Sequence, residues 1–299
     1  MKRYNTLNDY FRSKFGTKIG KVSINAGLSC PNRDNGGKGC LFCTDSGGSE
    51  FSGDCHKSIT QQTEEGKTVN ERKWSASRHI AYFQNFSNTY ANPSVLSDLY
   101  EEALAVPCIA GIAIATRPDC LGDDIMGLLE ELNKRTFLWL ELGLQTSSEA
   151  TAKLINRGYE NSVFEEAMSG VEKAGIKTVV HLIAGLPGEN KGDFIRSVKY
   201  INGFNPWGVK IHNIYIQRNS PLYEYSILNE FTPLEMDEYI DWVTDAIMHL
   251  GKDIIIHRLT GDPDKSMLIA PAWIRHKLRV ISEIDRVLGI KGGSQGCLA

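Results

Sequence analysis

The strongest constraint on the fold is an alternation of short apolar segments with amphipathic segments of helical length, from about residue 79 onward. The apolar segments are predicted strands, at residues 79–84, 110–115, 137–142, 178–184, 209–216 and 253–257. The segments between them repeat apolar residues at three- and four-residue steps, which predicts helices at 94–105, 122–134, 148–156, 161–174, 191–202 and 233–250. This alternation is typical of repeated βα units with parallel strands.

An earlier apolar segment at residues 21–25 adds one more predicted strand. The fold class is therefore α/β, and we expect a partial (β/α) barrel of about six βα units, with its active face at the carboxyl ends of the strands. A doubly wound sheet fits the same pattern. No internal repeat or low-complexity linker divides the chain, so residues 1–299 are predicted to form one domain.

A glycine-rich loop, residues 30–58, interrupts the pattern and contains three clustered cysteines. Cys30 and Cys40 are separated by nine residues, and Cys40 and Cys43 by two. A structural zinc site would need a fourth ligand, either Cys55 or His56. A Cys40–Cys43 disulfide is a second possibility, and an iron–sulfur cluster with one open iron is a third. The spacing alone favours the cluster and leaves the other two open.

Bulk properties limit the compartment and the partners. The chain has an odd number of cysteines, seven, no apolar run of 18 residues and no secretory signal, so we expect a soluble cytoplasmic protein with reduced thiols and no membrane contact. The formal net charge of -3 gives no global signal for nucleic acid. Two local basic segments, residues 1–21 and 275–279, are candidate phosphate contacts.

Beyond the cysteines, several short motifs follow the predicted strands and helices in order. They are Tyr82–Asn85, Thr116–Asp119, Glu141–Gln145, Asn156–Gly158 and Gly185–Glu189, together with the opening Arg3–Leu7 and Phe15-Gly16. With the nine-then-two cysteine spacing, this ordered set resembles the radical S-adenosylmethionine (SAM) superfamily. The likeness is greatest to the elongator-catalytic-subunit-like branch and the YhcC-type bacterial proteins.

The resemblance implies a partial TIM barrel of the radical SAM type, with a core at about residues 20–220 and a C-terminal extension at about 221–299. It implies a [4Fe-4S] cluster on Cys30, Cys40 and Cys43, and SAM bound to the open iron. In such enzymes SAM is cleaved reductively to a 5'-deoxyadenosyl radical. Because the cofactor supplies the reactive chemistry, no catalytic side chain is expected beyond the cofactor ligands.

The resemblance also implies a set of SAM contacts. They are Phe42, Gln84, Asn85, Glu141, Gln145, Arg157, His181 and Gly185. Phe42 would present an aromatic face to the adenine, and Arg157 could pair with the SAM carboxylate. Many relatives have two glycines where this chain has Gln84 and Asn85. Several carry Glu where this chain has Ala115, and Glu141 could provide that carboxylate instead.

The branch implies a tRNA-modifying enzyme that acts on the C5 side chain of the wobble uridine, for example by trimming carboxymethylaminomethyl to aminomethyl. Its expected partners are tRNA and an electron donor such as flavodoxin or ferredoxin. One alternative is a radical SAM enzyme that acts on a small metabolite. A more remote alternative is a zinc-binding interaction protein, which would be colourless and would not cleave SAM.

Overall fold

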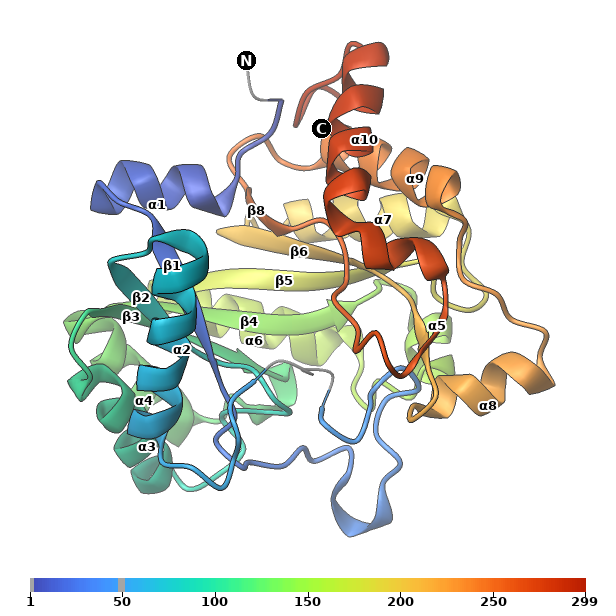
Figure 1. Cartoon of the computed structure of the whole chain (residues 1–299). Coiled ribbons are helices and arrows are strands. Elements are labelled where there is room, and N and C mark those ends of the chain that lie inside the picture. Colours follow the sequence, from blue (N-terminus) through green and yellow to red (C-terminus); the bar gives the residue numbers. More distant parts are fainter. Residues whose placement is uncertain (1–2, 48–51) are drawn as a thin grey trace.

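The structure, a computed structural model, describes residues 3–47 and 52–299. Its centre is a seven-stranded parallel sheet in the order β1-β2-β3-β4-β5-β6-β8 (Figure 1). The strands are β1 (Ile19–Ile24), β2 (Arg78–Phe83), β3 (Ile109–Thr116), β4 (Phe137–Gln145), β5 (Lys177–Ala184), β6 (Gly208–Asn213) and β8 (Ile255–Arg258). Because the order in space follows the order in sequence, the sheet curls into a half-barrel and does not reverse direction as a doubly wound sheet would.

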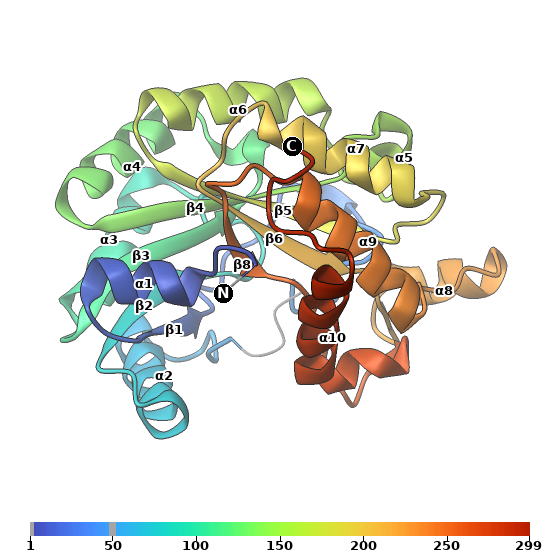
Figure 2. The ribbon, with the colours of Figure 1, turned by 90° about the horizontal axis from the view of Figure 1, so that it is seen from above.

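Helices cover the convex face of the sheet, and Figure 2 shows α4, α6 and α7 following its curve. The longer helices are α2 (Ile59–Trp74), α3 (Pro93–Ala105), α4 (Asp123–Arg135), α6 (Asn161–Lys173), α7 (Lys191–Asn202), α9 (Met236–His249) and α10 (Lys277–Ile290). The shorter helices are α1 (Leu7–Phe15), α5 (Glu149–Leu154) and α8 (Pro221–Leu228), with 3-10 turns at Asp34–Gly36, Pro118–Cys120 and Ala272–His276. A small antiparallel pair, β7 (Ile216–Gln217) and β9 (Leu268–Ala270), completes the described elements.

Strand alternation separates a core from a cavity. In β4, Leu138, Leu140, Leu142 and Leu144 pack into the main core beneath the helices. The residues between them point into the half-barrel, because successive side chains of a strand face opposite sides. Near the start of β4 the inward residue is the buried Trp139, and towards its end the inward residues are Glu141, Gly143 and Gln145.

An aromatic cluster closes the amino-terminal end of the half-barrel. Phe11 and Phe15 of α1 pack on Phe137, with ring centroids 6.4 and 5.4 Å away. Trp139 and Trp207 extend the cluster inward, 5.6 Å apart. Packed side chains therefore fill this end of the half-barrel, and the cavity residues of β4, such as Glu141 and Gln145, lie beyond them towards the carboxyl ends of the strands.

All seven predicted strands are found, and the partial barrel is confirmed. The predicted strand at 209–216 is divided, since β6 ends at Asn213 and β7 begins at Ile216. The helices α1, α2, α8 and α10 were not predicted. The predicted loop is irregular apart from the 3-10 turn Asp34–Gly36, and residues 48–51 within it lie outside the described residues. No helix in the described ranges is both long and apolar enough to cross a bilayer.

Candidate active site

A cavity of about 230 Å³ opens at the carboxyl ends of the strands, where parallel α/β barrels carry their active sites. Most of the residues singled out by the sequence line it: Cys30, Cys40, Cys43, Phe42, Gln84, Glu141, Gln145, Arg157 and His181. Two do not, Asn85 and Gly185. The fold therefore brings together side chains that are more than 100 residues apart in sequence.

The cysteine loop is fastened to the segment after α5. The amide of Asn32 donates to the carbonyl oxygen of Asn156, at 2.7 Å, and lies 3.5 Å from Cys40 Sγ. Asn156 returns a bond to the carbonyl of Gly39, also at 2.7 Å. The backbone N–H of Leu41 donates to Ile155, at 2.8 Å. These contacts explain how a loop with little intrinsic structure can hold Cys40 at the cavity wall.

The three thiols suit a group larger than one metal ion. A tetrahedral zinc with bonds of about 2.3 Å would draw its sulfur ligands to within about 4 Å of one another. The sulfur atoms of Cys30, Cys40 and Cys43 do not all lie within 4.8 Å of one another. The proposed fourth zinc ligands, Cys55 and His56, are exposed, group with Asp54 and do not line the cavity. Three cysteines that line one cavity fit an iron–sulfur cluster with one open iron.

Arg117 supplies positive charge beside the cysteines. Burial raises the pKa of Cys40 to about 12, the neighbouring Cys43 adds to the rise, and Arg117 opposes it. The guanidinium of Arg117 is held by both oxygens of Asp119, at 2.8 and 2.6 Å, and by the carbonyl of Arg157. A fixed cation at this point would stabilise the negative charge of a thiolate-ligated cluster.

Glu141 is the centre of a buried hydrogen-bond network. Its carboxylate accepts from the Tyr82 hydroxyl at 2.6 Å, from Trp139 Nε1 at 3.0 Å and from His181 Nε2 at 2.9 Å. It is also ion-paired with Lys210, which donates in addition to the Tyr82 hydroxyl at 2.9 Å. The network joins β2, β4, β5 and β6 across the cavity.

The charges within this network follow from its surroundings. Burial opposes ionisation of Glu141, but Lys210 and His181 outweigh it and hold the pKa of the carboxyl well below its ordinary value. Burial lowers the pKa of His181, and its hydrogen bond to Glu141 opposes that shift. Burial and Glu141 raise the pKa of Tyr82 well above its ordinary value, which keeps the phenol a donor.

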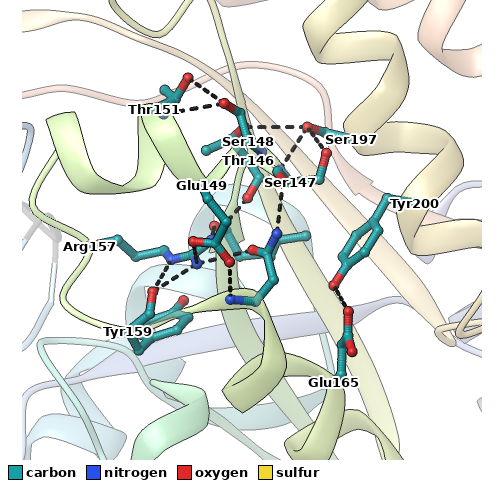
Figure 3. Close-up of polar contacts among 12 residues, drawn as sticks. Thr146, Ser147, Ser148, Glu149, Thr151, Arg157, Tyr159, Glu165, Ser197 and Tyr200 are labelled. Carbon is teal, nitrogen blue, oxygen red and sulfur yellow. Dashed lines mark hydrogen bonds and ion pairs between the residues drawn. The ribbon is translucent and has the colours of Figure 1, made fainter.

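Arg157 uses its hydrogen-bonding groups entirely within the protein. It is 1% exposed, and each of its five N–H groups has an acceptor. The acceptors are the carbonyls of Leu144, Thr146 and Tyr159 and the side chain of Asn161. Figure 3 shows the bonds from Arg157 to Tyr159. Its guanidinium also lies 4.4 Å from the Tyr159 ring centroid. Arg157 therefore fixes the end of β4, where Gln145 has a φ of +69° and its amide covers Gly143.

Two of the predicted SAM contacts, Asn85 and Gly185, do not line the cavity. Asn85 is 2% exposed and donates to the carbonyl of Ser46, at 2.7 Å, so it anchors the end of the cysteine loop. Gly185 has a φ of +80°, and a Cβ there would stand 2.9 Å from Leu234. Both residues shape the backbone around the cavity, and their contact with SAM stays a prediction.

The sequence reasoning did not assign a role to Lys210, His212 or Arg258, which all line the cavity. A signal was present, because Lys210 and His212 alternate with Val209 and Ile211 in an otherwise apolar strand. Such alternation indicates one core face and one face lining a polar space. Arg258 gave a weaker signal, since it is the last residue of a four-residue strand.

Comparison with known protein families agrees with this geometry. Residues 27–201 match the radical SAM superfamily, and residues 206–288 match the radical SAM C-terminal domain. YtqA of Bacillus subtilis (strain 168) is 38% identical over 297 residues, covering 99% of this chain and 92% of its own. YhcC of Escherichia coli (strain K12) is 31% identical, covering 95% and 92%.

More distant similarity reaches the elongator-like branch. A tRNA uridine(34) acetyltransferase of Methanocaldococcus jannaschii is 26% identical over 165 residues, which is 54% of this chain and 30% of that protein. The solved structure of Methanocaldococcus infernus Elp3 superposes with a TM-score of 0.71 at 17% identity, over 93% of this chain and 64% of that one, less than two thirds of its length. This chain, with its cysteine-lined half-barrel, therefore belongs to the radical SAM superfamily, alongside YtqA and YhcC and near the elongator-like branch.

Proposed function

We propose that the protein modifies the C5 side chain of the wobble uridine of tRNA in the cytoplasm, converting carboxymethylaminomethyl to aminomethyl. Its superfamily uses a [4Fe-4S] cluster and SAM. The tRNA substrate is supported by the similarity to proteins named for acting on tRNA uridine(34). Those relatives are much longer, and this chain matches less than a third of their length.

Cys30, Cys40 and Cys43 hold the cluster and leave one iron open for SAM. When bound, the two cofactors supply a 5'-deoxyadenosyl radical that removes a hydrogen atom from the substrate. Arg117, fixed by Asp119, offsets the negative charge at the cluster. Phe42, a cavity residue beside Cys43, offers an aromatic face for the adenine.

The other cavity residues position the reactants and exclude water. Glu141, Tyr82 and Lys210 keep their relative places through mutual hydrogen bonds. Gln145 is held towards the cavity by the turn that Arg157 fixes. The aromatic cluster around Trp139 closes the amino-terminal end of the half-barrel. Water and competing hydrogen donors therefore have one fewer route to a radical.

The proposed reaction balances with SAM as the oxidant. Hydrogen is removed from the carbon between the secondary amine and the carboxylate, and further loss of one electron and one proton gives a C=N bond. Water then cleaves that bond to the aminomethyl group and glyoxylate. SAM accepts the two electrons overall and becomes methionine and 5'-deoxyadenosine. The first electron comes from a donor such as flavodoxin or ferredoxin, and the second oxidation returns one.

The observation that carries this proposal is that one cavity is lined both by the three cysteines and by the cations Lys210 and Arg258. It can present a cluster to a substrate side chain that ends in an anion. A radical SAM enzyme for a small metabolite is the second candidate, favoured by the net charge of -3. The two differ in salt dependence, because tRNA phosphate contacts weaken steeply with added salt.

The test is anaerobic reconstitution with iron and sulfide, followed by reductant, SAM and tRNA isolated from a strain that lacks the gene. We expect 5'-deoxyadenosine, glyoxylate and aminomethyl uridine in equal amounts, with no product from the Cys40→Ala variant and normal product from Cys108→Ala. Formation of 5'-deoxyadenosine without any change in the tRNA nucleosides would reject the tRNA substrate and retain the radical SAM chemistry.

A further inference from the structure

The β6–β8 side of the cavity carries more positive than negative charge. Lys210 of β6 and Arg258 of β8 are paired in register and both line the cavity. Two more cations stand close to them. Lys277 shares Asp262 with Arg258, and Lys21 lies over the same Tyr82 ring as Lys210. We call these four residues the cationic end. Within the described residues, only Glu141 and Asp262 oppose them as ion-pair partners.

Arg258 is the least satisfied member of the cationic end. In the described ranges its guanidinium has a single ion pair, 4.0 Å from Asp262, and no hydrogen bond. Asp262 is shared, because Lys277 lies closer to it, at 3.2 Å. Nearby, Nε2 of His212 is buried without a hydrogen-bond partner among the described residues. Two groups that can donate hydrogen bonds therefore remain available at one side of the cavity.

The members of the cationic end repel one another. Burial lowers the pKa of Lys21 to about 8, and Arg258 and Lys277 lower it further against the pull of Glu141. Burial also lowers the pKa of Lys277, and Arg258 adds to that shift. Positive groups crowded in a partly buried space are stabilised when an anion joins them. A negatively charged ligand group would therefore be stabilised at this side of the cavity.

We propose that the cationic end, with Arg258 as its principal contact, binds the substrate's carboxylate and selects side chains that end in one. This inference rests on the proposed function, since it takes the substrate to be carboxymethylaminomethyl uridine. Arginine suits the task because its planar fork binds a carboxylate through two parallel hydrogen bonds. The remaining cations stabilise the same charge over a longer distance.

The site extends from Arg258, whose side chain is 31% exposed, to the buried Lys210, and this depth behind Arg258 favours a carboxylate of the base over a phosphate of the RNA backbone. Lys210 is 2% exposed and lies 4.4 Å from the centroid of the buried Tyr82 ring. A base side chain can extend into such a cavity, whereas a backbone phosphate remains at its mouth. A phosphate contact would also not distinguish one uridine modification from another.

The experiment measures binding, so that turnover is not needed. Two anticodon stem–loop RNAs are compared, one with carboxymethylaminomethyl and one with aminomethyl at the wobble uridine. The wild-type protein should bind the first at least about tenfold more tightly, the range of a charge-assisted hydrogen-bonded pair. Arg258→Gln should reduce that ratio to about one. Arg72→Gln, a change at an exposed arginine of α2 outside the cavity, should leave the ratio unchanged.

The two free nucleosides, which lack phosphate, provide the second arm. Discrimination between the nucleosides without binding of either RNA would retain the carboxylate site and reject the tRNA substrate. Binding of both RNAs with equal affinity would reject the carboxylate site and leave the tRNA proposal standing. A ratio that survives in Arg258→Gln would assign selectivity elsewhere, and no binding of any probe would overturn both proposals.

Discussion

Arg157 and Arg258 line the same cavity, yet the protein treats them in opposite ways. Arg157, which follows α5, has an acceptor for every N–H and is 1% exposed. Arg258, at the end of β8, has one shared ion pair at 4.0 Å. A buried donor that is fully paired serves the fold, whereas a cation left without close partners is available to a ligand. The difference separates a positioning side of the cavity from a binding side.

The largest expected effect is the loss of cluster binding when a cysteine is removed. It tests whether the cysteines have a role of their own, distinct from the positioning side and the binding side of the cavity. Cys40→Ala should abolish cluster binding, because the loop then offers two thiolates in place of three. The iron and sulfide content after reconstitution measures this. The free energy of unfolding of the cluster-free protein should change by less than about 1 kcal/mol. Cys108→Ala, at an exposed thiol, is the matched control, and a full cluster in Cys40→Ala would refute the ligand assignment.

Glu141→Gln should destabilise the protein by about 3–5 kcal/mol at neutral pH, because Glu141 is the counter-charge of Lys210, whose pKa burial already lowers well below its ordinary value. Since the folded pKa of Glu141 is depressed, its contribution is present above the unfolded value of about 4.3 and is lost as pH falls through the folded value. Urea titrations at neutral and acidic pH should therefore show the variant and the wild type converging in acid.

Glu131→Gln provides a control for that measurement. Glu131 pairs with Lys134 on the exposed face of α4, and such surface pairs contribute little to stability because water screens them. If Glu141→Gln and Glu131→Gln lower the free energy of unfolding by the same amount, Glu141 is not the buried centre of charge that the structure describes.

Lys21 gives the cationic end its own pH dependence. Its folded pKa is lowered to about 8, so the unfolded chain binds more protons from there up to its ordinary value of about 10.4. Stability should rise across this window, by up to about 3 kcal/mol. Lys21→Met should remove the rise, as measured by urea unfolding at a series of alkaline pH values. A rise of the same size in Lys21→Met would place its origin in another group.

The smallest effects compare the two arginines directly. Arg157→Gln should cost about 2 kcal/mol, since it leaves buried carbonyls of Leu144, Thr146 and Tyr159 short of donors. Arg258→Gln should change stability by less than about 0.5 kcal/mol, or raise it slightly by relieving repulsion. Thermal unfolding of the two variants side by side tests this. Equal losses of stability in the two variants would contradict the distinction between the positioning side and the binding side.

Much of the fold was predictable because the strands are near-continuous apolar runs, as parallel strands buried on both faces must be. Helix α2 was missed for the opposite reason: its buried face includes Gln62, Thr63, Lys67 and Asn70, so it lacks an apolar stripe. Gln62 is buried because it bonds the backbone of Asn25, at 2.9 and 3.0 Å, a partner that the helix's own sequence does not reveal.

The site divides in the same way. The cysteine spacing and the ordered motifs located most of the cavity wall. Whether the N–H groups of Arg157 and Arg258 have acceptors within the protein depends on residues far away in sequence. No local sequence pattern predicts those neighbours. The SAM contacts and the single-domain organisation stay predictions.

Residues near the two ends of the described chain are tied to each other. Arg3 accepts from the backbone of Gln295 at 2.8 Å, Asn5 bonds the side chain of Gln295 at 2.9 Å, and Ile256 donates to Asn5 at 2.9 Å. During synthesis, the first of these segments leaves the ribosome long before its partners exist. The segment before helix α1 can thus form its bonds to Gln295 only after translation has passed α10, which ends at Ile290, although α1 itself packs on Phe137 earlier in the chain.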